Sequence, residues 1–81
     1  MNRFALYYYD ACPFCQLVLR GLRGLNVEVE LRNILMEAQH RQDLLKGGGR
    51  TTVPCLLIED EHGQQQWMYE SRDILTYLQS L

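Results

Sequence analysis

Cys12 and Cys15 form the residue pair with the clearest chemical potential in this 81-residue sequence. Two residues that lie three apart on a helix place their Cα atoms roughly 5 Å from each other. Disulfides prefer about 4.4–6.8 Å, so this pair can form and break a disulfide without unfolding the chain. Pro13 suits the first turn of a helix, where its missing N–H costs nothing, and the spacing therefore predicts a helix that begins at Cys12.

The two thiols are expected to differ. Cys12 lies at the predicted helix start, near unpaired N–H groups and the positive end of the helix dipole. We expect this position to lower its pKa, and the resulting thiolate is the form that attacks disulfides. Cys15 lies one turn deeper and is expected to be more buried. It would attack the mixed disulfide on Cys12 and release the substrate.

Two other roles for the pair remain open. It could supply half of a zinc site, completed by Cys55 and by His40 or His62. Such sites usually contain a second closely spaced ligand pair, which this sequence lacks, so we predict no metal. A structural disulfide is rarer still in a reducing compartment. Cys55 follows Pro54 on a predicted strand and is interpreted as a small buried hydrophobe.

Alternating segments of the chain must position these residues. The pattern predicts an α/β fold of order β-α-β-α-β-β-α, with a four-stranded mixed sheet and helices on both faces. A right-handed crossover makes the first two strands parallel, and the last two form a hairpin. Val27, Val29 and Leu31 are expected to face inward. The predicted strands span 3–8, 27–31, 54–59 and 65–69; the helices span 12 to about 25, 36–46 (stopped by the glycines at 47–49) and from 71 onward.

Composition narrows the range of partners and locations. The net charge is −2 and no run of Lys or Arg occurs, so neither nucleic acid nor an anionic membrane is expected as a partner. The apolar runs are too short to cross a bilayer, and the N-terminus lacks the pattern of a signal peptide. We expect one domain over residues 1–81, a monomer, in the cytoplasm.

Three motifs occur in register along the chain. They are Tyr8-Tyr9-Asp10-Ala11-Cys12-Pro13-Phe14-Cys15, Arg50-Thr51-Thr52-Val53-Pro54 and Tyr69-Glu70-Ser71-Arg72-Asp73-Ile74. Together they resemble the motifs of glutaredoxins, members of the thioredoxin-fold superfamily, and most of all those glutaredoxins that are closest to glutathione-transferase N-terminal domains. The resemblance implies a thioredoxin-like fold, with glutathione as co-substrate. It also implies an enzyme that reduces protein disulfides and glutathionylated proteins.

The resemblance also assigns a glutathione-binding site. It implies a cis peptide between Val53 and Pro54, packed beside Cys12, although a trans proline that starts an edge strand is the alternative. The backbone of Val53, which follows Thr52, would pair with the cysteine of glutathione. Glu70 and Ser71 would hold the γ-glutamyl end; Ser71 could equally be a helix N-cap, and the two roles are compatible.

Two positions depart from the common glutaredoxin pattern. Tyr9 stands where many members have a lysine, and Phe14 stands where a tyrosine is frequent; both are expected to contact glutathione. The substitution at Tyr9 leaves the glycine carboxylate of glutathione without its usual cation. Arg41 and Arg50 are candidates for that role by position, and either could instead be a solvated surface charge.

Two further functions are compatible with the same residues. The protein could be a thioredoxin-like reductant served by a flavoprotein reductase instead of glutathione. It could also be a binding module, either a metal or iron–sulfur carrier or a catalytically idle glutathione-binding adaptor. Glutathione-dependent turnover distinguishes the enzyme from all of these.

Overall fold

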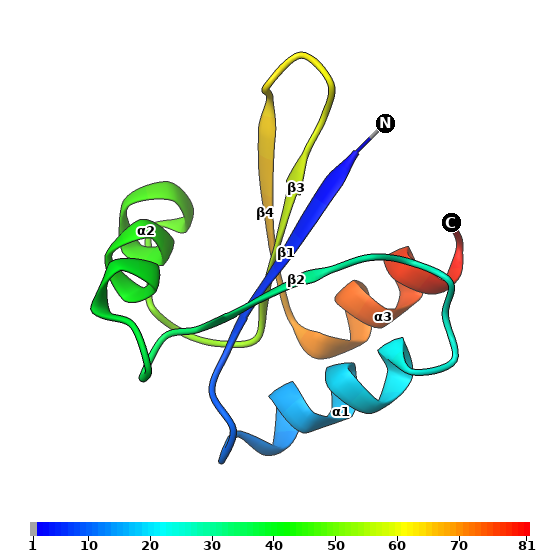
Figure 1. Ribbon diagram of the computed structural model, residues 1–81, viewed down its shortest axis with the longest axis horizontal. Helices are drawn as coiled ribbons and strands as arrows, with labels where there is room; N and C mark the ends of the chain where they lie inside the picture. Colours follow the sequence, from blue (N-terminus) through cyan, green and yellow to red (C-terminus); the bar gives the residue numbers. More distant parts are fainter. Residues whose placement is uncertain (1) are drawn as a thin grey trace.

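The computed structural model describes residues 2–81, and its elements follow the predicted order β-α-β-α-β-β-α. None of the helices in these residues is long and apolar enough to cross a bilayer. The elements, drawn in Figure 1, are β1 (Arg3–Tyr8), α1 (Pro13–Leu22), β2 (Glu30–Asn33), α2 (Ala38–Gly48), β3 (Cys55–Glu59), β4 (Gln65–Tyr69) and α3 (Ser71–Gln79).

The four strands form one mixed sheet in the order β2-β1-β3-β4. β1 runs parallel to β2, as a crossover helix requires, and antiparallel to β3, which forms a hairpin with β4. The register pairs Tyr7 with Cys55, and Cys55 with Tyr69. The end of β1, the start of β3 and the end of β4 therefore meet at one end of the sheet.

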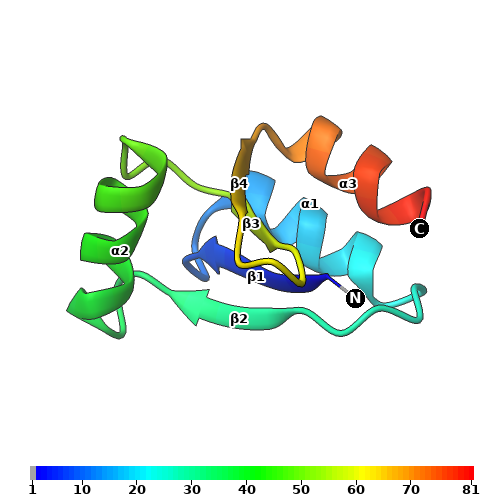
Figure 2. The ribbon, with the colours of Figure 1, turned by 90° about the horizontal axis from the view of Figure 1, so that it is seen from above.

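Helices cover both faces of the sheet, as predicted. Figure 2 shows α1 and α3 side by side on one face and α2 on the other. Because successive strand residues point to opposite faces, Leu6 and Leu56 pack under α1 and α3, whereas Tyr7 and Cys55 pack under α2. This arrangement yields two core clusters, one on each side of the sheet.

Three predicted boundaries in the first half of the chain are wrong. α1 ends at Leu22, three residues earlier than expected. β2 begins only at Glu30, and Leu31 is 49% exposed instead of buried, because β2 is the edge strand beyond β1. The helix predicted from Met36 begins later, since the Asn33 side chain accepts the N–H groups of Leu35 and Met36 and holds this segment in a turn.

The glycines at 47–49 do not stop α2 where the sequence predicted. The helix continues through Gly47 and Gly48 and ends at Gly49, whose φ is 92°. A Cβ atom on Gly47 would overlap the Trp67 ring, and one on Gly48 would overlap the Tyr69 hydroxyl. Two of the three glycines therefore allow the last turn of α2 to pack directly against side chains of β4.

Candidate functional site

Cys12 is the N-cap residue of α1. Its backbone is extended (φ −81°, ψ 117°), so α1 begins at Pro13, one residue later than predicted, with the proline in the first turn as expected. The Cys15 N–H donates to Cys12 Sγ across 3.3 Å, and the first turn of α1 contains no acidic residue. An otherwise unpaired N–H at a helix start thus points at this sulfur, which favours negative charge on it.

Cys15 is the more buried of the two thiols, as expected. Its exposed fraction is 0%, against 5% for Cys12, and both are free thiols in the structure. Burial, together with the hydrogen bond to Cys12, raises the pKa of Cys15 to about 12, although a backbone hydrogen bond from Tyr9 opposes the rise. Cys15 is therefore protonated at neutral pH.

The peptide bond between Val53 and Pro54 is cis, as the family resemblance implied. The Cys12 thiol donates to the Val53 carbonyl oxygen at 3.9 Å, so this loop faces the sulfur of Cys12. Among residues 2–81, the Val53 N–H donates no backbone hydrogen bond. Thr52 is exposed and Val53 half-buried, which leaves backbone of this loop accessible beside Cys12.

Glu70, and not Ser71, is the N-cap residue of α3. Ser71 is the first residue of the helix, so its interpretation as an N-cap is wrong. Glu70 has a φ of 79°, a value that favours glycine, and its side chain makes no capping hydrogen bond. The start of α3 consequently presents uncapped N–H groups at the same end of the sheet as Cys12.

The other predicted ligand contacts differ in exposure. Tyr9 is half-buried, packs against the core cluster under α2 and accepts the Cys12 N–H at its carbonyl oxygen, 3.3 Å away. Phe14 is 63% exposed beside Cys12. Arg50 lies over the Tyr69 ring, whereas Arg41 is exposed on α2. Sequence reasoning gave Tyr69 no role, and the sequence carries no signal that would have paired it with Arg50.

Cys55 lies in the core cluster under α2. It is completely buried, and burial raises its pKa to about 11, with the Tyr69 hydroxyl and Arg50 opposing the rise. Within residues 2–81, no group of three or more His, Cys, Asp or Glu side chains is arranged to hold a metal ion. The buried position agrees with the interpretation of Cys55 as a small hydrophobe.

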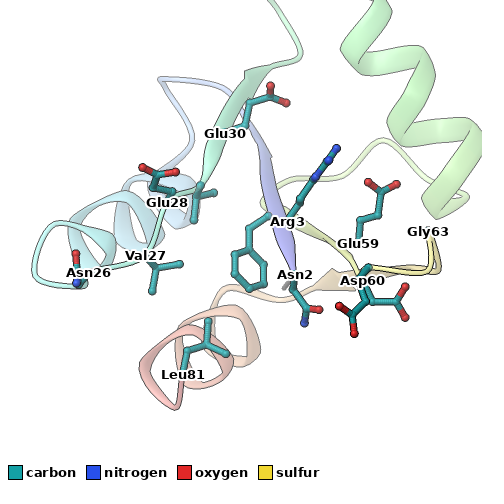
Figure 3. A pocket seen from close by; sticks show the side chains of 13 residues that line it. Asn2, Arg3, Asn26, Val27, Glu28, Glu30, Glu59, Asp60, Gly63 and Leu81 are labelled. Atoms are coloured by element: carbon teal, nitrogen blue, oxygen red, sulfur yellow. The ribbon is translucent and has the colours of Figure 1, made fainter.

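A broad hollow of about 1550 Å³ lies at the other end of the sheet. Figure 3 shows Arg3 from β1, Glu28 from the segment that leads into β2 and Glu30 at its start, and Glu59 and Asp60 where β3 ends. Leu81, just beyond α3, also lines the hollow. None of the predicted site residues lines this hollow, so the thiols and the acidic hollow are separate features.

Solved structures with the same architecture include glutathione transferases. A glutathione transferase homologue from Drosophila mojavensis, solved with bound glutathione, is 26% identical with a TM-score of 0.77 over 99% of this chain. An epsilon-class glutathione S-transferase from the housefly Musca domestica is 28% identical, with a TM-score of 0.72 over 96% of this chain. The chain spans only about a third of those two proteins, 35% and 34% respectively.

A thioredoxin-like protein has the same fold at the same size. Its TM-score is 0.73, with 22% identity over 94% of this chain and 100% of that chain. The fold is therefore thioredoxin-like, as the sequence predicted.

Sequence comparisons agree with the structural ones. Glutaredoxin 3 of Escherichia coli K12 is 31% identical over 62 residues, which cover 76% of this chain and 75% of that protein. This similarity and the fold support a function of the thiol oxidoreductase type. The family model described as glutathione S-transferase, N-terminal domain matches residues 6–81. The chain therefore belongs to the glutathione S-transferase N-terminal domain family, in the thioredoxin-like group that also contains glutaredoxins.

Proposed function

We propose that this protein is a glutathione-dependent thiol–disulfide oxidoreductase. Its substrates would be glutathionylated proteins and protein disulfides in the cytoplasm. The observation that carries the proposal is the hydrogen bond from the Cys15 N–H to Cys12 Sγ, at the start of α1. This hydrogen bond supports Cys12 as the nucleophile, because it favours the thiolate. Cys15, one turn deeper and protonated, would then be the resolving thiol.

With a glutathionylated protein, one thiol is sufficient. The Cys12 thiolate attacks the sulfur of glutathione, the S–S bond to the protein breaks, and the protein leaves as a thiolate that takes up a proton. Cys12 now carries glutathione in a mixed disulfide. A second glutathione, as thiolate, attacks the glutathione sulfur of that adduct, releases oxidised glutathione and restores the Cys12 thiolate.

A protein disulfide requires Cys15 as well. Cys12 attacks one sulfur of the substrate and forms a mixed disulfide, while the other substrate sulfur leaves and is protonated. Cys15 loses its proton and attacks Cys12 Sγ, which expels the reduced protein and closes a Cys12–Cys15 disulfide. Two glutathione molecules then reduce that disulfide and are oxidised to one glutathione disulfide. Burial raises the pKa of Cys15, so this thiol must lose a tightly held proton before it attacks.

The end of the sheet beside Cys12 offers contacts for glutathione. The accessible backbone of Val53 supports pairing with the cysteine of glutathione, beside Cys12. The uncapped start of α3 supports binding of the γ-glutamyl carboxylate by Ser71, since free N–H groups at a helix start bind anions. The solved structure from Drosophila mojavensis holds glutathione on the same fold.

The test is a coupled assay in which glutathione reductase and NADPH report oxidised glutathione formed from a glutathionylated peptide. We expect turnover by the wild-type protein, none by Cys12→Ser, and retained turnover by Cys15→Ser. With a protein disulfide as substrate, Cys15→Ser is expected to be inactive. If the wild-type protein turns over only with a flavoprotein thioredoxin reductase in place of glutathione, the thioredoxin-like alternative replaces this proposal.

A further inference from the structure

We infer that two copies of this chain pair through the outer edges of their β2 strands, antiparallel and about a two-fold axis at Leu31. The pairing would join two four-stranded sheets into one continuous sheet. It is independent of the proposed function, and it departs from the monomer expected from the sequence. It depends on the open backbone edge of β2, on an exposed leucine at the centre of that edge, and on two charges that flank this leucine.

β2 has an outer edge with which no other strand of residues 2–81 pairs. The strand order is β2-β1-β3-β4, and Figure 2 shows β2 along the border of the sheet. The Ile34 N–H donates to the Tyr8 carbonyl oxygen at the end of β1. Because backbone groups alternate between the two sides of a strand, the N–H and C=O groups of Leu31 point away from β1. β2 contains neither lysine nor proline, the residues that commonly protect such an edge.

Leu31 is the apolar centre of this edge. Its exposed fraction is 49%, and it borders a groove of about 500 Å³ whose lining includes Leu19 and Leu22 of α1 and Val27 and Val29 before β2. In the two-fold pair, the two Leu31 residues would lie directly opposite each other and exchange both backbone hydrogen bonds. Each leucine side chain would then cover apolar surface of the other copy.

The charges of β2 match those of a second copy in this register. Glu30 and Arg32 flank Leu31 and share the opposite face of the strand, because alternate residues point to the same side. With the two Leu31 residues opposite each other, Glu30 of each copy lies opposite Arg32 of the other. Side chains at such positions are close together, and opposite charges there stabilise the pair. A two-fold axis makes both contacts at once.

Arg32 is already held in place for this contact. Its guanidinium donates to the Tyr7 hydroxyl, lies 5.4 Å from the centroid of the Tyr7 ring, and pairs with Glu30 of its own strand. The side chains of Arg32 and Glu30 are 28% and 62% exposed, so a second copy can reach both. In the dimer, the four charges would alternate in sign, with each carboxylate between two guanidinium groups.

The second copy is the occupant that this edge fits. An extended peptide of another protein would pair with β2 through backbone groups that any sequence offers. β2 itself supplies the matching side chains, because its order acid, leucine, base becomes base, leucine, acid when the strand is reversed.

The first test is the mass of the protein in solution against its concentration, by sedimentation equilibrium in excess reductant, which excludes disulfide-linked chains. The wild-type protein is expected to approach twice the monomer mass as its concentration rises to about 1 mM, because so small an interface is weak. Leu31→Asp places two carboxylates opposite each other and is expected to raise the dissociation constant at least about tenfold. Leu45→Asp changes a leucine of α2 with a matched exposure of 51% and is expected to dimerise like the wild type.

The second test exchanges the charges. Glu30→Arg makes the edge wholly basic and Arg32→Glu makes it wholly acidic, so each variant alone is expected to be a monomer. An equimolar mixture restores both opposite-charge pairs and is expected to form a heterodimer. Melting temperatures show whether Arg32→Glu still folds without its contact to Tyr7, and if it does not, the comparison of Leu31→Asp with Leu45→Asp decides the inference.

Three results would overturn the pairing. The first is a wild-type protein that stays monomeric at about 1 mM, also when an added extended peptide binds β2 instead. The second is a Leu31→Asp variant that dimerises like the wild type, because the contact then lies elsewhere. The third is a mixture of two folded charge variants that stays monomeric. Turnover in the coupled assay is a separate readout, so a dimer without turnover contradicts the proposed function and leaves this inference intact.

Discussion

The N–H of Cys15 points at the sulfur of Cys12 across 3.3 Å, while the side chain of Cys15 is itself fully buried. The backbone N–H of Cys15 thus favours negative charge on the Cys12 sulfur, while burial keeps the Cys15 thiol itself neutral. The two functions that we propose for the pair, attack and resolution, would therefore be divided within a single helical turn. Four predictions follow from this division and from the packing around it.

Alkylation is expected to select Cys12. At neutral pH, iodoacetamide should modify Cys12 first, because Cys15 and Cys55 are fully buried and burial raises their pKa values to about 12 and about 11. Peptide mass spectrometry after increasing exposure times measures the order. Denatured protein, in which all three thiols react, is the control. Labelling of Cys55 as fast as that of Cys12 would contradict the described burial.

The free energy of unfolding is expected to fall at alkaline pH. A thiol in the unfolded chain ionises near pH 8.5, whereas burial raises the pKa of Cys55 to about 11. The folded state holds this proton more tightly, so the stabilisation is complete below about pH 8.5 and is lost as pH rises through 11. Denaturant unfolding from pH 7 to 11 is expected to show a shallower decline for Cys55→Ala. Parallel curves for the two proteins would refute the link to Cys55.

Glu70 is expected to store backbone strain. Its φ of 79° is costly for a residue with a Cβ atom, by about 1–3 kcal/mol. Glu70→Gly is therefore expected to be about 1 kcal/mol more stable than Glu70→Ala, as measured by urea unfolding. Both variants lack the carboxylate, so equal glutathione affinities would accompany this difference. Equal stabilities would mean that the surrounding structure relaxes the strain.

Alanine is expected to destabilise α2 where it usually stabilises a helix. Replacing Gly48 by alanine introduces a Cβ atom against the Tyr69 hydroxyl, and the same change at Gly47 meets the Trp67 ring. Overpacking of this kind costs about 1–3 kcal/mol. Gly24→Ala, where the added Cβ meets nothing within 4 Å, is the control and is expected to be neutral or slightly stabilising. A stabilised Gly47→Ala would contradict the close packing of α2 on β4.

Local sequence pattern was sufficient for some elements and not for others. β1 and β4 have the predicted bounds, Arg3–Tyr8 and Gln65–Tyr69, because each is an apolar or aromatic run bounded by turn residues. The three glycines do end α2, but at Gly49, two residues later than predicted, because the helix continues through Gly47 and Gly48. Gly47 and Gly48 are needed because Trp67 and Tyr69, about twenty residues away, pack directly against them. This contact becomes visible only once α2 is packed on β4.

The same distinction holds for the site. The burial of Cys15 and the cis bond before Pro54 followed from a motif and its family resemblance. The contact between Arg50 and Tyr69 did not, because it joins residues 19 apart in sequence. Leu31 was expected inside because its neighbours alternate, but the order of strands in the sheet leaves it at the edge.

The acidic hollow lies near both ends of the described chain. Arg3 and Leu81 both line it, and Figure 1 places the N and C labels on the side away from the loop between β1 and α1. A fluorescent reporter, an affinity tag or an electrode linker joined at either terminus would thus extend away from Cys12. Such a fusion would leave Cys12 open to macromolecules, so the redox activity proposed for this chain could be measured on a labelled or immobilised protein.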